Sequence, residues 1–148
     1  MPRKKKEETS VPPKTQTRAT KNKRAKISRK KVKENKENRV LLKKIWDLLN
    51  QKKAEDLVIL DLREISGYLE FFVIATALSP LHVKNLTHEI LRLMDEEKRK
   101  PFAPVESNFS SGWQVLDYGD IVVHIFNKEK RELYNLEKLW EKAKQISF

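Results

Sequence analysis

Three side chains in the C-terminal part of the chain could take part in proton transfer or metal-assisted chemistry. Asp117 and Asp120 flank a Tyr-Gly step, and His124 follows inside a nearly continuous apolar run. Converging carboxylates can hold the metal ion of a phosphoryl-transfer enzyme, and a histidine can act as a general base. One interpretation is therefore a small metal-dependent nucleotidyltransferase or phosphotransferase that uses Asp117, Asp120 and His124.

The spacing of these residues favours a structural role instead. Asp117 and Asp120 are separated by a predicted turn, so they need not converge, and Asp in turns usually hydrogen-bonds its own backbone. His124 lies between Val122 and Phe126 on one face of a predicted strand. That position is typical of a packed histidine bonded to a nearby backbone or carboxylate group.

Other signs of catalysis or metal binding are weak. His82 and His88 are six residues apart on a predicted helix, which points them in different directions, whereas a zinc pair needs residues on one face. The chain has no cysteine and only three glycines, which excludes thiolate metal sites and a glycine-rich phosphate loop. We therefore expect no enzyme activity, no metal and no cofactor.

The positive charge of the chain is confined to its first residues. The 148 residues have a formal net charge of +11, and residues 1–38 hold 15 Lys or Arg against 4 Glu. Residues 39–148 are balanced, with 17 basic and 17 acidic side chains. Because residues 1–38 contain few large apolar side chains, we expect a disordered basic N-terminal arm followed by a folded domain over residues 39–148.

A basic arm of this kind is typical of contacts with phosphate backbones, which carry no sequence information and weaken with salt. RNA contact is favoured over a merely solvated tail, and a nuclear localisation signal has a similar composition. An organellar transit peptide would be poorer in acidic residues. The candidate RNA-contacting residues are Lys21, Lys23, Arg24, Lys26, Arg29, Lys30 and Lys31.

Apolar periodicity predicts the elements that position the candidate residues. A first helix is indicated by Leu41, Leu42, Ile45, Leu48 and Leu49, and a second begins at Ser79-Pro80, which suit an N-cap and first turn. A last helix over about 129–145 would place its apolar residues on one face, namely Leu133, Leu136, Leu139, Trp140 and Ala143. Strands are predicted at 56–64 and 69–77 and in a hairpin at 112–117 and 121–126, whereas 101–107 is at best an edge strand.

This order, α-β-β-α-(β)-β-β-α, predicts an α/β (α+β) domain in which a mixed β-sheet is flanked by helices. The longest apolar runs are far too short to span a bilayer, and no secretory signal pattern follows the basic N-terminus. The absence of cysteine agrees with a reducing cytosol, so we expect a cytoplasmic protein. The domain shows no interleaving of exposed basic and aromatic residues, so RNA contact would be confined to the arm.

Two blocks of the sequence resemble the ribosomal silencing factors, the Iojap-like family. The earlier block is VILDLREISGYLEFFVIATALSPLHV, and the later block is WQVLDYGDIVVHIFNKEKRELYNLEKLW. The later block carries the family's recurring residues at Trp113, Asp117, Gly119, Asp120, Val123, His124, Arg131, Tyr134, Leu136, Glu137, Leu139 and Trp140. The resemblance covers about Leu41 to Trp140. The chain departs from the family pattern in loops at the rim of the sheet, at Glu70-Phe71, in TALS and at Glu106-Ser107.

The resemblance implies a fold related to the nucleotidyltransferases but without their paired catalytic acids. It also implies that the protein binds the large ribosomal subunit through large-subunit ribosomal protein fourteen, at the inter-subunit face. There it would block joining of the small subunit and so repress translation. Ribosomal RNA would be contacted through the arm, no membrane would be involved, and a homodimer of the unbound protein stays open.

Physical arguments assign roles within this interpretation. Trp113, at the mouth of the hairpin, is either an interface anchor or a core residue. Tyr118, at the tip of the turn, is expected to be exposed and to contact the partner. Asp117 and Asp120 would give the rim negative charge that complements a basic ribosomal protein. Trp140 is expected in the core, and Arg131 and Glu137 are expected to form a pair within the last helix.

Overall fold

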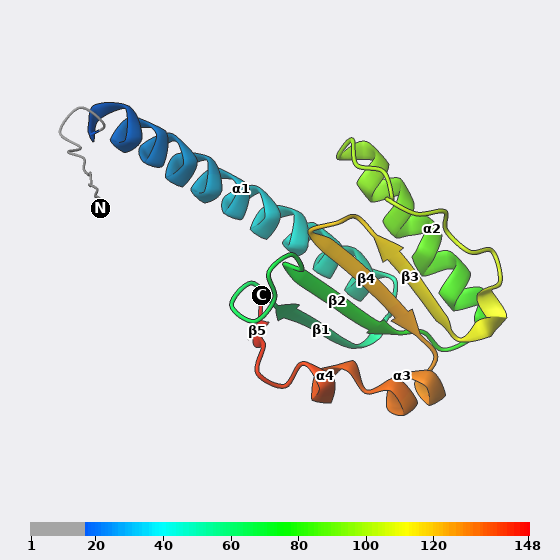
Figure 1. The fold of residues 1–148 in the computed structure, drawn as a ribbon. Helices are drawn as coiled ribbons and strands as arrows, with labels where there is room; N and C mark the ends of the chain where they lie inside the picture. Colours follow the sequence, from blue (N-terminus) through cyan, green and yellow to red (C-terminus); the bar gives the residue numbers. More distant parts are fainter. Residues whose placement is uncertain (1–16) are drawn as a thin grey trace, which may run out of the picture. The chain divides into compact units, whose positions relative to one another are not determined.

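The computed structural model describes the backbone of residues 17–148, and the side chains of residues 25, 26, 29, 33 and 35–148. The elements, in chain order, are α1 (Thr17–Gln51), β1 (Glu55–Asp61), β2 (Phe71–Thr76), α2 (Pro80–Glu96), the 3-10 turn η2 (Phe109–Ser111), β3 (Trp113–Asp117), β4 (Ile121–Phe126), α3 (Lys128–Tyr134), α4 (Leu136–Leu139) and β5 (Lys144–Ile146) (Figure 1). The chain divides into two units, Met1–Leu41 and Leu42–Phe148. Among the described residues, none of the helices combines the length and apolar character needed to cross a membrane.

The second unit is built on a five-stranded sheet in the order β3-β4-β2-β1-β5. The central strands β2 and β4 are parallel, with Val73 opposite Val123, and the remaining pairs are antiparallel. A parallel pair needs a crossover connection, and α2 supplies it between β2 and the β3–β4 hairpin. The predicted mixed sheet flanked by helices is confirmed.

One face of the sheet is covered by α2 and by the C-terminal part of α1. The buried side chains of the two helices recur at helical spacing, at Leu42, Ile45, Leu49, Val83, Leu86, Ile90 and Met94. Lys44 of α1 also pairs with Glu97, just beyond α2. As predicted, Ser79 is the N-cap of α2 and Pro80 its first residue, and the Ser79 hydroxyl accepts the His82 N–H at 3.0 Å.

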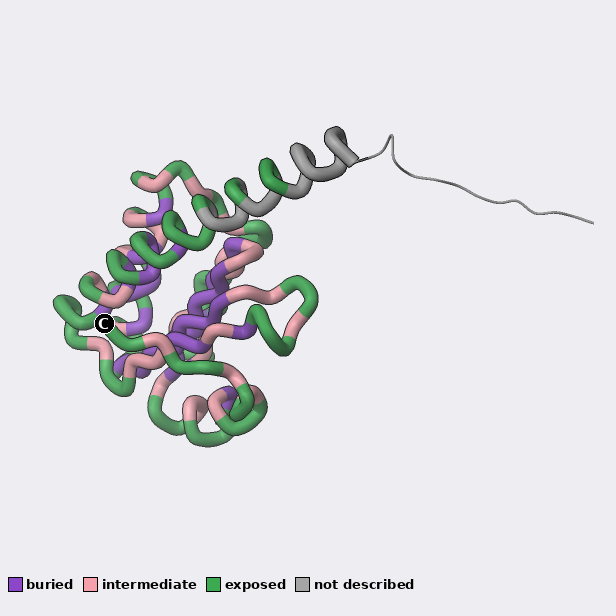
Figure 2. The backbone as a smooth tube through the Cα atoms, turned by 90° about the vertical axis from the view of Figure 1, so that its left-hand side faces the viewer, coloured by how far each residue is buried: buried purple, intermediate pink, exposed green. Residues whose placement is uncertain are grey.

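The opposite face of the sheet packs against the last segment of the chain. Its buried cluster contains Leu60, Leu62, Phe72, Ile74, Val122, Phe126 and, from α4, Leu136. Trp113, Trp140 and Ala143 border this cluster and are partly buried, which agrees with the expected packing of Trp140. Figure 2 shows the buried residues gathered along the strands and on the inner sides of the surrounding elements.

The helix α1 begins earlier than the sequence analysis expected. Residues 17–38 were expected to be disordered, but they are helical, while residues 1–16 lie outside the described part of the chain. No proline or glycine occurs between Pro13 and Gly67, and the segment is rich in good helix formers. Because residues 42–51 already form a helix with buried side chains, the arm extends it without a new nucleus. The composition of this segment predicts that it cannot form a hydrophobic core of its own, but it does not predict that the segment cannot form a helix.

The prediction of a single last helix over residues 129–145 is also wrong. Asn135 takes the left-handed conformation, with φ 43°, and so ends α3, while its side chain accepts the Lys138 N–H and caps α4. Residues Lys144–Ile146 then form β5 beside β1. As a result Leu133 and Leu139 are exposed instead of sharing a buried face.

The predicted hairpin is confirmed within a residue of its expected bounds. Residues 101–107 form no strand but lie along the outer edge of β3. The Phe102 N–H donates to the Asp117 carbonyl at 2.8 Å, and the Gln114 side-chain amide donates to the Glu106 carbonyl at 2.7 Å.

Candidate functional site

An aromatic cluster on the β3–β4 hairpin and α3 reaches the surface at Trp113, Val115 and Tyr134, which we call the aromatic face, and it rests on the buried rings of His124 and Phe126. The Trp113 ring stacks on Phe126 with centroids 5.2 Å apart, and it lies 4.5 Å from the Tyr134 ring. Trp113 and Val115 share a face of β3 because alternate strand residues point the same way. Val115 is 41% exposed and Tyr134 46% exposed, so apolar surface lies over a packed base.

His124 lies under this surface and is 6% exposed. Its Nδ1 accepts a hydrogen bond from the Trp113 indole N–H at 3.2 Å. The His124 and Phe72 rings pack edge to face, with their centroids 4.6 Å apart. Burial lowers the pKa of His124 to about 4, against a smaller opposing effect of the Asp117 charge. The packed-histidine interpretation is confirmed, although the bonding partner is an indole and not a backbone or carboxylate group.

Arg131 fixes the α3–α4 segment to the sheet next to the aromatic face. Its Nε donates to Glu137 Oε1 at 2.7 Å, and its Nη1 donates to the Thr76 hydroxyl at the end of β2 at 2.9 Å. The predicted Arg131–Glu137 pair is confirmed. The contact with Thr76 was not foreseen, because the two residues are far apart in the sequence.

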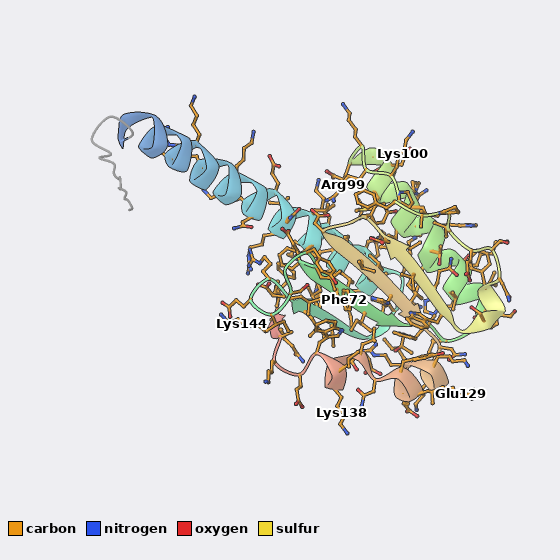
Figure 3. The ribbon with its side chains drawn as sticks, in the orientation of Figure 1. Phe72, Arg99, Lys100, Glu129, Lys138 and Lys144 are labelled. Carbon is orange, nitrogen blue, oxygen red and sulfur yellow. The ribbon has the colours of Figure 1, made fainter. Side chains whose placement is uncertain are left out.

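A second feature is a cavity of about 880 Å³ at the β3–β4 turn, which we call the turn cavity. Three separate segments line it: residues 68–70, residues 98–100 with Phe102, and residues 117–120. Figure 3 shows Arg99 and Lys100 beside each other beyond the C-terminal end of α2, and Phe72 on the central strand.

The two candidate carboxylates at this cavity are engaged in local contacts. Asp117 Oδ1 accepts the Gly119 N–H at 2.8 Å, which confirms the predicted turn chemistry for Asp117. Asp120 forms an ion pair with Arg99, and Arg99 also donates to the Tyr118 carbonyl at 3.4 Å. Nothing in the sequence pointed to Arg99, because it lies on a different element.

Tyr118 is buried, at 2% exposed, so the expectation that it is exposed at the tip of the turn is wrong. Gly119, with φ 87°, allows the chain to reverse directly after Tyr118, and the Tyr118 N–H bonds back to the Ile121 carbonyl at 2.9 Å. The Phe102 ring lies over Gly119. Burial raises the pKa of Tyr118 to about 12. Tyr118 therefore offers no ring to a partner.

The family model described as "Ribosomal silencing factor during starvation" matches residues 33–148. The chain belongs to this family. A ribosomal silencing factor from Halalkalibacterium halodurans is 35% identical over 109 residues, which cover 74% of this chain and 92% of the relative. A mouse protein named "Mitochondrial assembly of ribosomal large subunit protein 1" is 30% identical over 95 residues, which cover 63% of this chain and 42% of the mouse protein. The bacterial relative carries the name of a regulator and not of an enzyme.

Solved structures show the same fold. A crystal structure from Bacillus halodurans has a TM-score of 0.63 at 33% identity and covers 74% of this chain and 99% of its own. One from Chromobacterium violaceum has a TM-score of 0.64 at 26% identity and covers 74% of this chain and 90% of its own. The resemblance to the silencing factors found in the sequence is confirmed by the family model and the bacterial relative.

The three residues of the enzyme interpretation do not meet in this silencing-factor fold. Asp117 and Asp120 line the turn cavity, whereas His124 packs under Trp113. Within the part of the chain that the structure describes, no group of three or more His, Cys, Asp or Glu side chains could hold a metal ion. His82 bonds the Leu78 N–H and the Lys52 carbonyl, at 2.9 and 2.8 Å, and His88 packs against Phe109.

The candidate RNA-contacting residues lie on α1. Lys26 and Arg29 are exposed. The side chains of the other five lie outside the described residues: Lys21, Lys23, Arg24, Lys30 and Lys31.

Proposed function

We propose that this protein binds the large ribosomal subunit and prevents the small subunit from joining it, which silences translation. Membership of the silencing-factor family supports the ribosome as the partner. The aromatic face supports docking by shape and not chemistry, because half-exposed apolar side chains stand on a packed base. Contiguous exposed apolar surface of this kind is typical of protein interaction sites.

Within the proposed complex, the aromatic face meets large-subunit ribosomal protein fourteen at the inter-subunit surface. Trp113 and Tyr134 are the anchors, because large aromatic side chains that are already ordered lose little entropy on binding. Asp117 follows Val115 at the next-but-one position of β3, so its partly buried carboxylate lies on the same strand face. Asp120 adds less negative charge than expected, since Arg99 compensates it.

Sedimentation of ribosomal subunits tests this function. Purified subunits are mixed under joining conditions with excess protein and separated on a sucrose gradient. The protein should migrate with free large subunits, and the fraction of joined ribosomes should fall. Subunits that join to the same extent with and without excess protein would contradict the proposal.

The basic arm is proposed to add salt-sensitive contact with ribosomal RNA. Replacement of all seven candidate Lys and Arg residues of the arm by Gln keeps good helix formers but removes the charge. We expect weaker binding to the large subunit. We also expect a plot of log affinity against log salt concentration to flatten, by roughly 0.7–0.9 for each phosphate that the arm no longer neutralises.

Affinity measured between low and moderate salt checks this prediction. A variant with only Lys21, Lys23, Arg24 and Lys26 changed should show an intermediate slope. If the wild-type and seven-residue variants have equal slopes, the arm makes no phosphate contacts.

A further inference from the structure

Two exposed rings and two lysines stand around the turn cavity. Tyr68 is 85% exposed and Phe102 is 77% exposed, and both line the cavity. Lys98 and Lys100 line it too, and neither enters an ion pair among the residues that the structure describes. Large aromatic side chains this exposed are unusual unless a partner covers them.

The Phe102 ring packs on the β3–β4 turn, and the loop that carries Tyr68 is ordered by a hydrogen bond. The Phe102 N–H is bonded to the Asp117 carbonyl, and its ring lies so close to Gly119 that a Cβ there would be 2.5 Å from Phe102 Cε2. Tyr68 lies in a loop that closes on itself, because the Ser66 hydroxyl accepts the Leu69 N–H at 3.0 Å. The Phe102 ring, which packs against Gly119, therefore loses little conformational freedom when a flat group stacks on it.

The acidic residues of the cavity are occupied by local partners. Asp120 pairs with Arg99, Asp117 accepts the Gly119 N–H, and Glu70 interacts electrostatically with Arg63. The charged side chains of the lining balance, with Glu70, Asp117 and Asp120 against Lys98, Arg99 and Lys100, and Lys98 and Lys100 are the cations among them that enter no ion pair among the described residues. Lys98 and Lys100, separated by a single residue, are therefore the two cations that remain available to an anionic group at the cavity.

We propose that the turn cavity binds unpaired nucleotides of RNA. Bases would stack on Tyr68 and Phe102, and the neighbouring phosphates would contact Lys98 and Lys100. A single strand alternates flat bases with phosphates, which matches a cavity that combines rings and cations, whereas a duplex hides its base faces.

This inference rests on the proposed function, because ribosomal RNA is the RNA that a factor bound to the large subunit meets. It differs from the expectation that RNA contact is confined to the arm. The basic and aromatic residues are not interleaved in the sequence. The fold brings them together from the loop after β1 and the segment after α2, beside the β3–β4 turn.

Binding of a fluorescent single-stranded oligouridylate of roughly ten nucleotides tests the cavity, with anisotropy as the readout. The protein is the full chain carrying the seven arm substitutions, so that arm binding does not mask the cavity. The double variant Tyr68→Ala, Phe102→Ala should bind at least about tenfold more weakly, since each stacked base contributes about 1–3 kcal/mol. Lys98→Gln with Lys100→Gln should reduce the salt slope by about one to two.

Tyr134→Ala is the matched control, because it removes an exposed ring from the aromatic face and should leave oligouridylate affinity unchanged. The Tyr68 side chain does not pack in the core, so Tyr68→Ala alone should leave the fold unchanged. This single variant keeps the test valid if Phe102→Ala disturbs the turn. Tyr68→Phe should retain binding, because stacking needs the ring and not the hydroxyl. Thermal unfolding of each variant confirms that the domain is intact.

Three outcomes would overturn the inference. The Tyr68 and Phe102 variants could bind the oligonucleotide as tightly as their parent, uridine monophosphate could compete as well as the oligonucleotide, or a duplex could bind equally well. Subunit joining is measured separately with the same variants. If the parent protein blocks joining but its oligonucleotide binding does not depend on Tyr68 and Phe102, only this inference is defeated. If binding does depend on the two rings but the protein leaves joining normal, the proposed function is defeated.

Discussion

Glutamate in place of Val115 should abolish the block of subunit joining at protein concentrations where the wild type is fully effective. Val115 is the exposed aliphatic residue between Trp113 and Asp117 on the face of β3 that we propose for docking. A carboxylate there would be buried without a partner in the complex, which costs several kcal/mol. We expect affinity for the large subunit to fall roughly 100-fold, as measured by co-sedimentation across a protein titration.

The control for this experiment is Ile65→Glu. Ile65 is also 41% exposed, but it lies in the loop after β1 and away from the aromatic face. It receives the same chemical change at the same exposure, and we expect wild-type activity. Equal activity of the Val115 and Ile65 variants would remove the aromatic face from the docking surface, whether or not the protein silences ribosomes.

Acid should destabilise the protein through His124 as the pH falls from 6.5 toward 4. Burial holds the pKa of His124 at about 4 in the folded state, against 6.5 for an unperturbed histidine. Below pH 6.5 the unfolded chain therefore binds a proton that the folded chain does not. The contribution of the buried neutral His124 to the free energy of unfolding is fully present above pH 6.5. It is lost as the pH falls toward 4, by about 3 kcal/mol in total.

Urea unfolding at several pH values between 7 and 4 measures this loss, and His124→Phe should remove it. Arg63 holds the pKa of Asp61 below its usual value of 3.8, so the contribution of Asp61 is lost only at still lower pH. The exposed His88 serves as the control, and His88→Gln should retain the full acid sensitivity. A free energy of unfolding that is flat between pH 6.5 and 4 in the wild type would mean that His124 is not held neutral by burial.

Short-range patterns in the sequence were sufficient to predict much of the fold. The hairpin, the all-buried strand β2 and the start of α2 at Ser79-Pro80 each depend on neighbouring residues, and each is found where it was predicted. The last helix failed at Asn135, because a single left-handed residue can end one helix and cap the next. Apolar spacing alone does not detect that change of direction.

The candidate site was predictable only in part. Trp113 and His124 were recognised, but their mutual hydrogen bond depends on the register of β3 against β4, which sets Val115 opposite His124. The turn cavity had no sequence signal. Tyr68, Lys98 and Phe102 come from segments without a common motif, and Arg99 meets Asp120 only because α2 ends above the turn.

The segment 101–107 also covers part of the edge of the sheet at β3. It occupies the outer edge of β3 with hydrogen bonds from Phe102 and Gln114, and its residues Pro101 and Pro104 have no N–H to offer to another strand. A margin that is partly covered in this way is less open to pairing with a foreign strand, which is one means by which proteins protect edge strands from fibril-like polymerisation. Any self-association of concentrated protein should then proceed through side-chain surfaces more readily than by extension of the sheet at β3.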